Sequence, residues 1–516
     1  MVPLECDESK GGHMKYLLDH FHAEPNDSMA SLRLSVSKRL RLPSSSIRIE
    51  ILSRHLEWNI KEKKMEMVYD LCIDTNEFVR DTSIRFLPEL EATKVKDCNK
   101  KLPPVIVGGG IIGLSAALYL SRFGAKPIVL ERGEETLNSN KTLQNEDKLT
   151  SYGGFHGRNG AVFIHERTSL SEDIFQRLVR TGIVQPTLKD RYIFLTPENC
   201  VLLVTNMIND IRKAGGEVRF NSEWIGCDYF LGKLKRVHYL RNGKEETIKT
   251  KELLFAVSSL DSSTVSCLAN SKIEVQPKKT RIGLVIEYPY SEYKAAFLKG
   301  SRITWPNFFI DETFLSKDGR SIRFTGPYPH SEIHVNGHVA NNEARLGLDG
   351  KGESTAKFIL SVDVNLNESK YIVGSDGDSA FYHMMLRKDK PLSLPVEMVT
   401  DFISKREPWK LGRTKPSYKN GVFMCDLHGF LHDSISDILQ YGLVHIYRNY
   451  PLFSSNNGLI YGFMESAGSP FEIFQEDYYT SKRGVFAIED PQNLGLNLNQ
   501  SIQTGVDVAS FLLKDA

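Results

Sequence analysis

The chain has 516 residues, of which 41% are hydrophobic and 25% are charged, and this length allows roughly two to four domains with buried cores. Its 65 Lys and Arg residues balance 64 Asp and Glu residues, so the overall charge does not favour nucleic acid or an anionic membrane as a partner. Because residues 1–20 lack the pattern of a secretory signal and no long apolar run follows, we expect a cytoplasmic protein with no membrane and no nucleic-acid partner.

The first elements in chain order are expected to form a small α+β domain of ferredoxin-like type over residues 31–98, preceded by an N-terminal tail over residues 1–30. Alternating apolar and polar residues predict strands in SLRLSV, SIRIEILSRHLEW and MEMVYDLCID. The segment SKRLRLPSSS predicts a short basic helix that ends at a proline and a serine turn. We expect this domain to pack on the domain that follows it or to mediate assembly, with its basic residues on a solvated face.

A strand, a glycine turn and a helix follow in PVIVGGGIIGLSAALYLSRFGAKPIVLERG, residues 104–133. Gly108, Gly110 and Gly113 form the pattern GxGxxG, and Glu131 closes the second strand. The first glycine permits the tight turn, the second lets the backbone approach a pyrophosphate, and the third lets the helix pack on the strand. The helix start offers free N–H groups to phosphates, and Glu131 is expected to accept hydrogen bonds from a ribose hydroxyl.

This pattern predicts a bound dinucleotide, but it does not by itself distinguish FAD from NAD. The alternative is a glycine-rich turn in an empty Rossmann-like unit. Strand-like and helix-like segments alternate through the rest of the chain, which favours an α/β fold.

The unit at residues 104–133 resembles the FAD-binding units of the glutathione-reductase-type flavoprotein superfamily. The whole chain resembles more closely the family of FAD-dependent, or NAD(FAD)-utilizing, dehydrogenases. The similarity is collinear, covers most of residues 30–513, and includes SKRLRLPSSSIRIEILSRHLEWNIKEKKMEMVYDLCID, KTRIGLVIEYP, LPVEMVTDFIS and TKPSYKNGVFMCDL. It implies a Rossmann-like FAD-binding domain over residues 99–260 and 415–516. An α+β substrate domain is expected to be inserted between them, over residues 261–414.

The resemblance also implies further contacts to FAD, and the sequence departs from the family pattern at several of them. In YGGFHGRNGAVF, Asn159 stands where the family has Asp. Arg158 is expected to neutralise a pyrophosphate or to hold an anionic substrate, or else to be an exposed loop residue. Near the C-terminus, Asp490 matches the acid near the ribityl chain and the flavin phosphate, although most glycines of that segment are absent. The candidate cofactor-binding residues are Gly108, Gly110, Gly113, Glu131, Arg132, Arg158, Asn159, Gly160, Trp224, Asp490 and Gly505.

Three histidines, His330, His334 and His338, recur every four residues in HSEIHVNGHVANNE. On a helix they would suggest a metal site, but Asn336-Gly337 predicts a hairpin turn with the histidines on strands, so we expect no metal. The resemblance implies that this region lines the substrate side of the flavin. His334, His338 and Asn341 are therefore candidate substrate contacts or proton donors, with a surface or core role as the alternative.

Seven scattered cysteines form no CxxC pair, so neither a disulfide framework nor a redox-active dithiol is indicated. No second GxGxxG has a strand and a helix around it, so we expect an external electron donor or acceptor. The sequence therefore predicts an FAD-dependent oxidoreductase, a dehydrogenase or oxidase that acts on a small organic substrate. The alternative is a degenerate flavoprotein fold that serves as a binding or assembly subunit without redox turnover.

Overall fold

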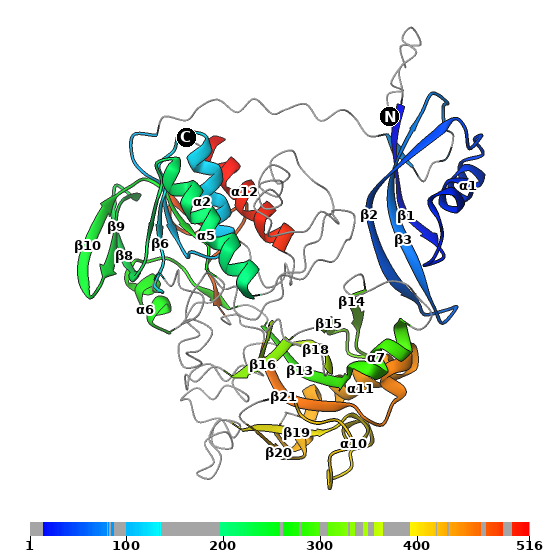
Figure 1. The fold of residues 1–516 in the computed structure, drawn as a ribbon. Coiled ribbons are helices and arrows are strands. Elements are labelled where there is room, and N and C mark those ends of the chain that lie inside the picture. The colour runs from blue at the N-terminus through cyan, green and yellow to red at the C-terminus, as the bar shows by residue number, and fades with distance from the viewer. Residues whose placement is uncertain are drawn as a thin grey trace.

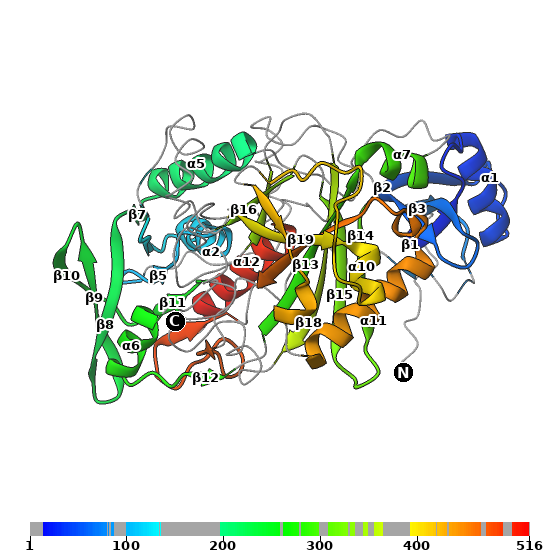
Figure 2. The same ribbon diagram turned by 90° about the horizontal axis from the view of Figure 1, so that it is seen from below.

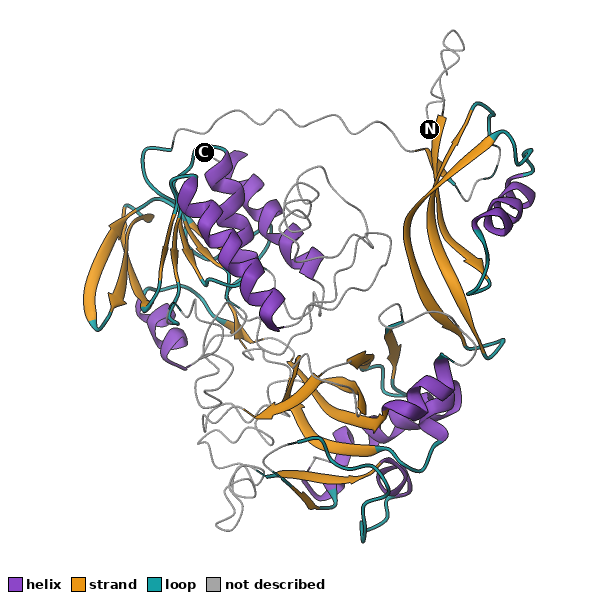
Figure 3. Ribbon diagram, viewed as in Figure 1, coloured by secondary structure: helices purple, strands orange, loops and turns teal. Residues whose placement is uncertain are grey.

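The computed structural model describes residues 14–79, 81, 84–86, 100–133, 135, 197–257, 262–277, 280–298, 308–328, 331–335, 344–348, 355–364, 393–418, 421–430, 433–465, 471–488 and 498–514. Figure 1 shows three groups of elements: an N-terminal sheet with one helix, a parallel sheet with helices, and a larger mixed sheet with helices. Figure 3 shows that each group contains both helix and strand. The fold is therefore of the mixed α/β class.

The N-terminal group is a four-stranded antiparallel sheet in the order β2-β3-β1-β4, with helix α1. Its elements are β1 (Met14–Ala23), α1 (Met29–Leu40), β2 (Ile47–Asn59), β3 (Lys64–Thr75) and β4 (Arg85–Phe86).

Helix α1 corrects one prediction, because SLRLSV, residues 31–36, is helical and not a strand. Ser28 caps the helix by accepting a hydrogen bond on its Oγ from the Ser31 N–H at 3.1 Å. Leu32, Val36 and Leu40 are buried at helical spacing. The expected N-terminal tail is also corrected, because β1 lies within residues 1–30 and pairs with β3.

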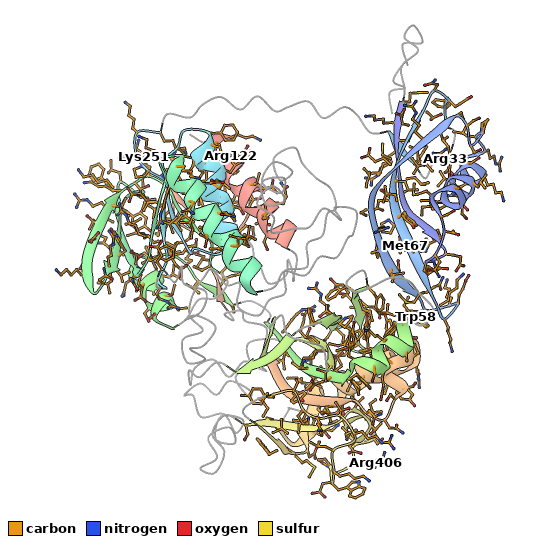
Figure 4. All side chains as sticks on the ribbon, viewed as in Figure 1. Arg33, Trp58, Met67, Arg122, Lys251 and Arg406 are labelled. Carbon is orange, nitrogen blue, oxygen red and sulfur yellow. The ribbon has the colours of Figure 1, made fainter. Side chains whose placement is uncertain are left out.

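The N-terminal sheet packs against the larger mixed sheet, and its buried residues form one continuous hydrophobic core with it. The Trp58 indole N–H donates to the Asn449 carbonyl oxygen at 2.9 Å, and its ring meets Phe297 edge-on at 5.7 Å. Figure 4 shows Trp58 at the end of the N-terminal sheet that faces the mixed sheet. In the part of the chain that the structure describes, this domain therefore packs on the mixed sheet, and a role in assembly stays a prediction.

The parallel group is a five-stranded sheet in the order β23-β11-β5-β6-β7, in which every neighbouring pair is parallel. The strands are β5 (Val105–Val107), β6 (Ile128–Leu130), β7 (Glu217–Arg219), β11 (Leu253–Phe255) and β23 (Val485–Ala487). One face is covered by α2 (Ile111–Arg122), α5 (Pro197–Lys213) and α12 (Leu498–Lys514). The other face packs on α6 (Ser262–Asn270) and on a sheet of β8 (Ser222–Phe230), β9 (Lys233–Arg241) and β10 (Lys244–Lys249).

The mixed group is a seven-stranded sheet in the order β14-β15-β18-β13-β21-β19-β20. Its strands are β13 (Thr280–Pro289), β14 (Ile310–Leu315), β15 (Ser321–Tyr328), β18 (Thr355–Val364), β19 (Leu394–Met398), β20 (Val422–Met424) and β21 (Leu459–Glu465). Its helices are α7 (Tyr290–Phe297), α10 (Val399–Ser404), α11 (Asp433–Asn449) and two short 3-10 turns, Leu427–Phe430 and Pro451–Ser454.

Two short ladders complete the described strands. One joins β12 (Gln276–Pro277) to β22 (Phe471–Glu472), and the other joins β16 (Ser331–Val335) to β17 (Ala344–Leu348). Among the helices in the described ranges, none has both the length and the apolar character needed to cross a membrane.

The boundaries expected for the inserted domain shift at both ends. The chain does not re-enter the parallel sheet at residue 415, as expected, because β20 and β21, which follow this residue, both belong to the seven-stranded sheet. The inserted domain does not begin at residue 261, as expected, because Leu268 and Ile273 still lie in the core beneath the parallel sheet. The chain passes between the two halves at residues 277–280 and 465–471, and the β12–β22 ladder joins these two crossings.

Candidate functional site

The turn between β5 and α2 has the backbone geometry that its glycines permit. Gly108 adopts φ +106°, and a Cβ there would lie 2.6 Å from the Ala256 carbonyl oxygen. A Cβ on Gly113 would lie 2.1 Å from the Gly108 carbonyl oxygen. Neither position accepts a side chain, so the helix begins directly against the strand that precedes it.

The start of α2 leaves backbone donors available for an anion. Gly110 is the N-cap in an extended conformation, with φ −68° and ψ 172°, and it supplies no side chain to cap the helix. The first intrahelical hydrogen bond runs from the Leu114 N–H to the Gly110 carbonyl oxygen at 2.8 Å. The N–H groups of residues 111–113 therefore have no intrahelical acceptor, and together with the helix dipole they suit the binding of a phosphate.

Glu131 lies beside this turn at the end of β6. Its Oε2 accepts a hydrogen bond from the Gly109 N–H at 2.7 Å, and its Oε1 accepts one from the Gly133 N–H at 2.7 Å. A carboxylate has about four acceptor positions, so it can still accept a ribose hydroxyl. The residues of the turn thus fit a dinucleotide, with backbone donors for the pyrophosphate and a carboxylate for the ribose, and the ribose contact itself stays a prediction.

Three other predicted cofactor-binding residues, Arg132, Trp224 and Gly505, lie in the part of the chain that the structure describes. Arg132 is exposed, and its Nη1 lies 4.0 Å from Glu223 Oε1. Trp224 is 4% exposed and meets Phe255 edge-on in the core, so packing accounts for its position. A Cβ on Gly505 would lie 2.4 Å from the Ile112 carbonyl oxygen, so this glycine lets α12 contact α2. The predicted contacts Arg158, Asn159, Gly160 and Asp490 lie outside the described residues.

The histidine hairpin differs from its prediction. His334 lies on β16 opposite Arg345, and Val335 pairs with Ala344. Residues 336–343 separate these partners, so the expected two-residue turn at Asn336-Gly337 is wrong. His338 and Asn341 lie outside the described residues. Within the residues that the structure describes, no group of three His, Cys, Asp or Glu side chains could hold a metal ion.

One face of the seven-stranded sheet carries charged residues that sequence reasoning missed. Arg281 Nε lies 2.7 Å from Asp363 Oδ1, and Arg323 donates to both carboxylate oxygens of Asp311 at 2.8 and 2.7 Å. Burial, and to a smaller extent the charge of Arg323, lower the pKa of Arg281. The opposite face carries Ile322, Phe324 and Leu360 under α11, so the strands alternate between a polar and an apolar face. This alternation in TRIGLVIE and SIRFTG was the signal that could have revealed the polar face.

Two family models match separate segments of the chain. The family "FAD-dependent protein, C-terminal domain-like" matches residues 380–467, and the family "Pyridine nucleotide-disulphide oxidoreductase" matches residues 104–147. The second match covers the glycine turn and Glu131, and the sequence contains no CxxC pair that a disulphide-reducing enzyme of that kind would use. The second match therefore covers the segment in which the sequence predicts a bound dinucleotide.

An uncharacterized protein of Clostridium beijerinckii is 24% identical over 505 residues, which are 89% of this chain and 91% of the relative. The solved structure of CtdE in complex with FAD is 14% identical with a TM-score of 0.35, and the match covers 81% of this chain and 86% of that one. A geranylgeranyl bacteriochlorophyll reductase-like protein of Thermoplasma acidophilum is 13% identical with a TM-score of 0.33, over 80% of this chain and 78% of its own. Both TM-scores are low, so these two structures add nothing to the identification.

The structure of the glycine turn and the two family matches agree with each other. The turn offers backbone donors and a carboxylate for a dinucleotide, and the family that matches residues 380–467 is described as FAD-dependent. The chain is a divergent FAD-dependent flavoprotein of the oxidoreductase type, with FAD as its cofactor.

Proposed function

We propose that the chain is a dehydrogenase or oxidase that acts on a small organic substrate and exchanges electrons with an external partner. The observation that carries this proposal is the intact turn at Gly108–Gly113, with an uncapped helix start and the Glu131 carboxylate beside it. FAD, when bound, supplies the hydride or electron transfer. The chain's own residues bind the cofactor, orient it and exclude water.

The polar face of the seven-stranded sheet is proposed as the substrate side. Arg281 directly follows the first crossing from the parallel sheet, and Ile282 pairs with Glu465, which precedes the second crossing. The Arg281–Asp363 end of this face therefore lies at the junction of the two halves. Arg281 Nη1 is buried and has no hydrogen-bond partner among the described residues, so it remains available to a polar or anionic group of a substrate.

At this junction the carboxylate of Asp363 is paired with Arg281, and His334 and His338 remain candidate proton donors. A second candidate function is a degenerate flavoprotein that serves as a binding or assembly subunit. The observation that favours it is the loss of most expected glycines from residues 484–505, where the family places its flavin-side contacts. The two candidates differ in whether FAD that is bound can also be reduced and reoxidised.

The first experiment measures the cofactor in the purified protein. An oxidoreductase is expected to be yellow, with bands at about 370 and 450 nm and one FAD released per chain on denaturation. Reduction by dithionite followed by reoxidation in air or by an artificial acceptor then separates redox competence from passive binding. Colourless protein whose melting temperature does not rise with added FAD would exclude the proposal.

Gly110→Val tests the position of the cofactor. A side chain at this helix start is expected to block the pyrophosphate and to empty the site, without changing the seven-stranded sheet. Gly226→Val is the matched control, because a Cβ on Gly226 would meet Ser271 Oγ at an ordinary 3.6 Å. If Gly110→Val retained the FAD content of the control, the cofactor would not bind at this turn.

A further inference from the structure

The turn between β8 and β9 carries two apolar side chains in water. Phe230 is 63% exposed and Leu231 is 85% exposed, and Leu231 is the most exposed large apolar residue in the described part of the chain. Phe230 pairs with Lys233, so Leu231 and Gly232 alone form the turn. Figures 1 and 2 both show the β8–β9–β10 sheet at the end of the molecule opposite the N-terminal sheet. The turn therefore belongs to a sheet at an outer margin of the protein, and its two apolar side chains are exposed.

The backbone at this turn disfavours the residue that it carries. Leu231 adopts φ +50° and Gly232 adopts φ +75°, as in a type I′ turn. That turn favours Asn, Asp or Gly at its first central position, because a leucine Cβ is strained at positive φ. The sequence thus places an exposed leucine where a polar residue would suit the turn conformation better and would be better solvated. Folding does not explain the choice, which points to a contact made by the leucine.

Exposed cations lie on the backbone segments next to this turn, and we define the basic collar as Lys233, Lys235, Lys249, Lys251 and Arg483. The collar is held together through the backbone. Lys233 forms a β-bridge with Arg483, and the Thr250 N–H donates to the Lys235 carbonyl oxygen at 3.2 Å, next to Lys251. Figure 4 shows Lys251 at the edge of the parallel half.

Two nearby carboxylates already have cationic or imidazole partners. Asp228 Oδ2 lies 3.1 Å from His238 Nε2, and Glu252 pairs with the Lys100 ammonium. The acidic side chains Glu245 and Glu246 lie toward the other end of the small sheet, opposite Leu240 and Tyr239. The balanced charge of the whole chain therefore conceals a local excess of positive charge around an apolar tip.

We propose that the Phe230–Leu231 turn and the basic collar dock this protein on the surface of an anionic lipid bilayer. An apolar pair at a projecting tip can enter the boundary between headgroups and acyl chains, while the surrounding cations remain at the level of the phosphates. An acidic protein would be attracted by the cations but offers no apolar phase to a two-residue projecting tip. The bilayer is the partner that uses both features, and it allows peripheral binding without a membrane-spanning helix.

The experiment is co-sedimentation of the full-length protein with vesicles of phosphatidylcholine alone and of phosphatidylcholine mixed with phosphatidylserine. Binding is expected to the mixed vesicles and not to the neutral ones, and it is expected to fall with added salt. The double variant Phe230→Ser/Leu231→Asn is expected to lose about tenfold or more in vesicle affinity. Its melting temperature should stay the same or rise, because Asn suits the turn better than Leu.

Leu315→Asn is the matched control, because Leu315 is 63% exposed at the end of another hairpin. It should bind vesicles as the unchanged protein does. Lys233→Gln and Lys235→Gln should each weaken binding about fivefold. The proposal is overturned if mixed vesicles are not bound, or if the tip variant binds them as well as the Leu315→Asn control. It is also overturned if the protein does not bind vesicles but binds polyglutamate tightly, and if the Phe230→Ser/Leu231→Asn variant binds polyglutamate equally well.

Discussion

Glu131 and Gly109 are joined by a 2.7 Å hydrogen bond from the backbone N–H of the glycine turn to the carboxylate at the end of the neighbouring strand. A Cβ on Gly109 would lie 2.8 Å from the same Oε2 atom, so the carboxylate lies directly against the backbone. The acid therefore has a second task besides its predicted contact to ribose. It fixes the turn that is predicted to receive the pyrophosphate.

Glu131→Ala is expected to weaken FAD binding about 10- to 100-fold, because two backbone N–H groups lose a charged acceptor and the ribose loses its own. Glu131→Gln retains one acceptor oxygen and should fall between the alanine variant and the unchanged protein. Titration of the apoprotein with FAD, followed by flavin fluorescence, measures the affinities. Equal affinities in all three proteins would show that this carboxylate has no part in the site.

Gly505→Ala is expected to lower stability by about 1–3 kcal/mol and to reduce FAD content, because the new Cβ meets the backbone of α2 at Ile112. Gly442→Ala is the matched variant in α11, where a Cβ would meet the side-chain ends of Leu360 and Ile322 at 3.2 to 3.3 Å. Those ends can move, and alanine favours a helix over glycine, so Gly442→Ala should be nearly neutral. Thermal melts of the two variants, with and without FAD, test the contrast.

Glu397 predicts a pH dependence of stability. It is fully buried on β19, and its Oε1 accepts a hydrogen bond from the Leu427 N–H at 3.0 Å. Burial, with smaller contributions from Asp426 and Asp401, raises the pKa of Glu397 from 4.5 to about 8. A raised pKa means that the folded state holds its proton more tightly than the unfolded state. The stability from this proton is complete below about pH 4.5 and declines as pH rises through about 8.

Glu397→Gln removes that titration while keeping the side chain's shape. Its stability relative to the unchanged protein should increase with pH by about 1.4 kcal/mol per unit between the two pKa values and then level off. Urea unfolding at a series of pH values measures this difference. A constant difference from pH 4 to 9, about the range spanned by the titration, would contradict the assignment.

Glu287 and Lys357 form a buried ion pair on the polar face of the seven-stranded sheet. The two side chains are almost fully buried, with Lys357 Nζ 3.6 Å from Glu287 Oε1, and the Tyr461 hydroxyl donates to Glu287 Oε2. Lys357→Met is expected to cost about 3–5 kcal/mol, because it leaves the carboxylate buried without its cation. Lys357→Met/Glu287→Leu should recover most of that loss. A double variant as unstable as the single one would show that packing, and not charge, sets the cost.

The sequence predicted the dinucleotide turn well because every part of it is local. Strand, glycines, helix and acid all lie within residues 104–133, and the structure forms β5, α2 and β6 there. The error at residues 31–36 has an equally local cause. Leu32, Leu34 and Val36 alternate with polar residues as in a strand, but Leu34 is 53% exposed while the other two are buried. Leu32 and Val36, the two buried residues, are four positions apart, which is the spacing of one helix face.

The domain boundaries could not be predicted because they depend on contacts between residues far apart in sequence. Strand β21 resembles any apolar strand, and its place in the seven-stranded sheet is fixed by pairing with β13, as between Val285 and Tyr461. The Arg281–Asp363 pair likewise joins residues on two separate strands. Composition and periodicity report which face a residue prefers, and they do not report which strand lies next to it.

The parallel sheet is completed by residues more than 350 positions after its first strand, since β23 pairs with β11 and α12 packs on α2. During synthesis, residues 485–514 must emerge from the ribosome before these contacts can form, because domains assemble as their segments emerge. The N-terminal sheet can form first and the seven-stranded sheet second. Until β23 and α12 are synthesised, β5, α2 and β6 remain in an incomplete domain. A truncation that removes only α12 should therefore yield protein that is made in full amount but accumulates with chaperones and without flavin.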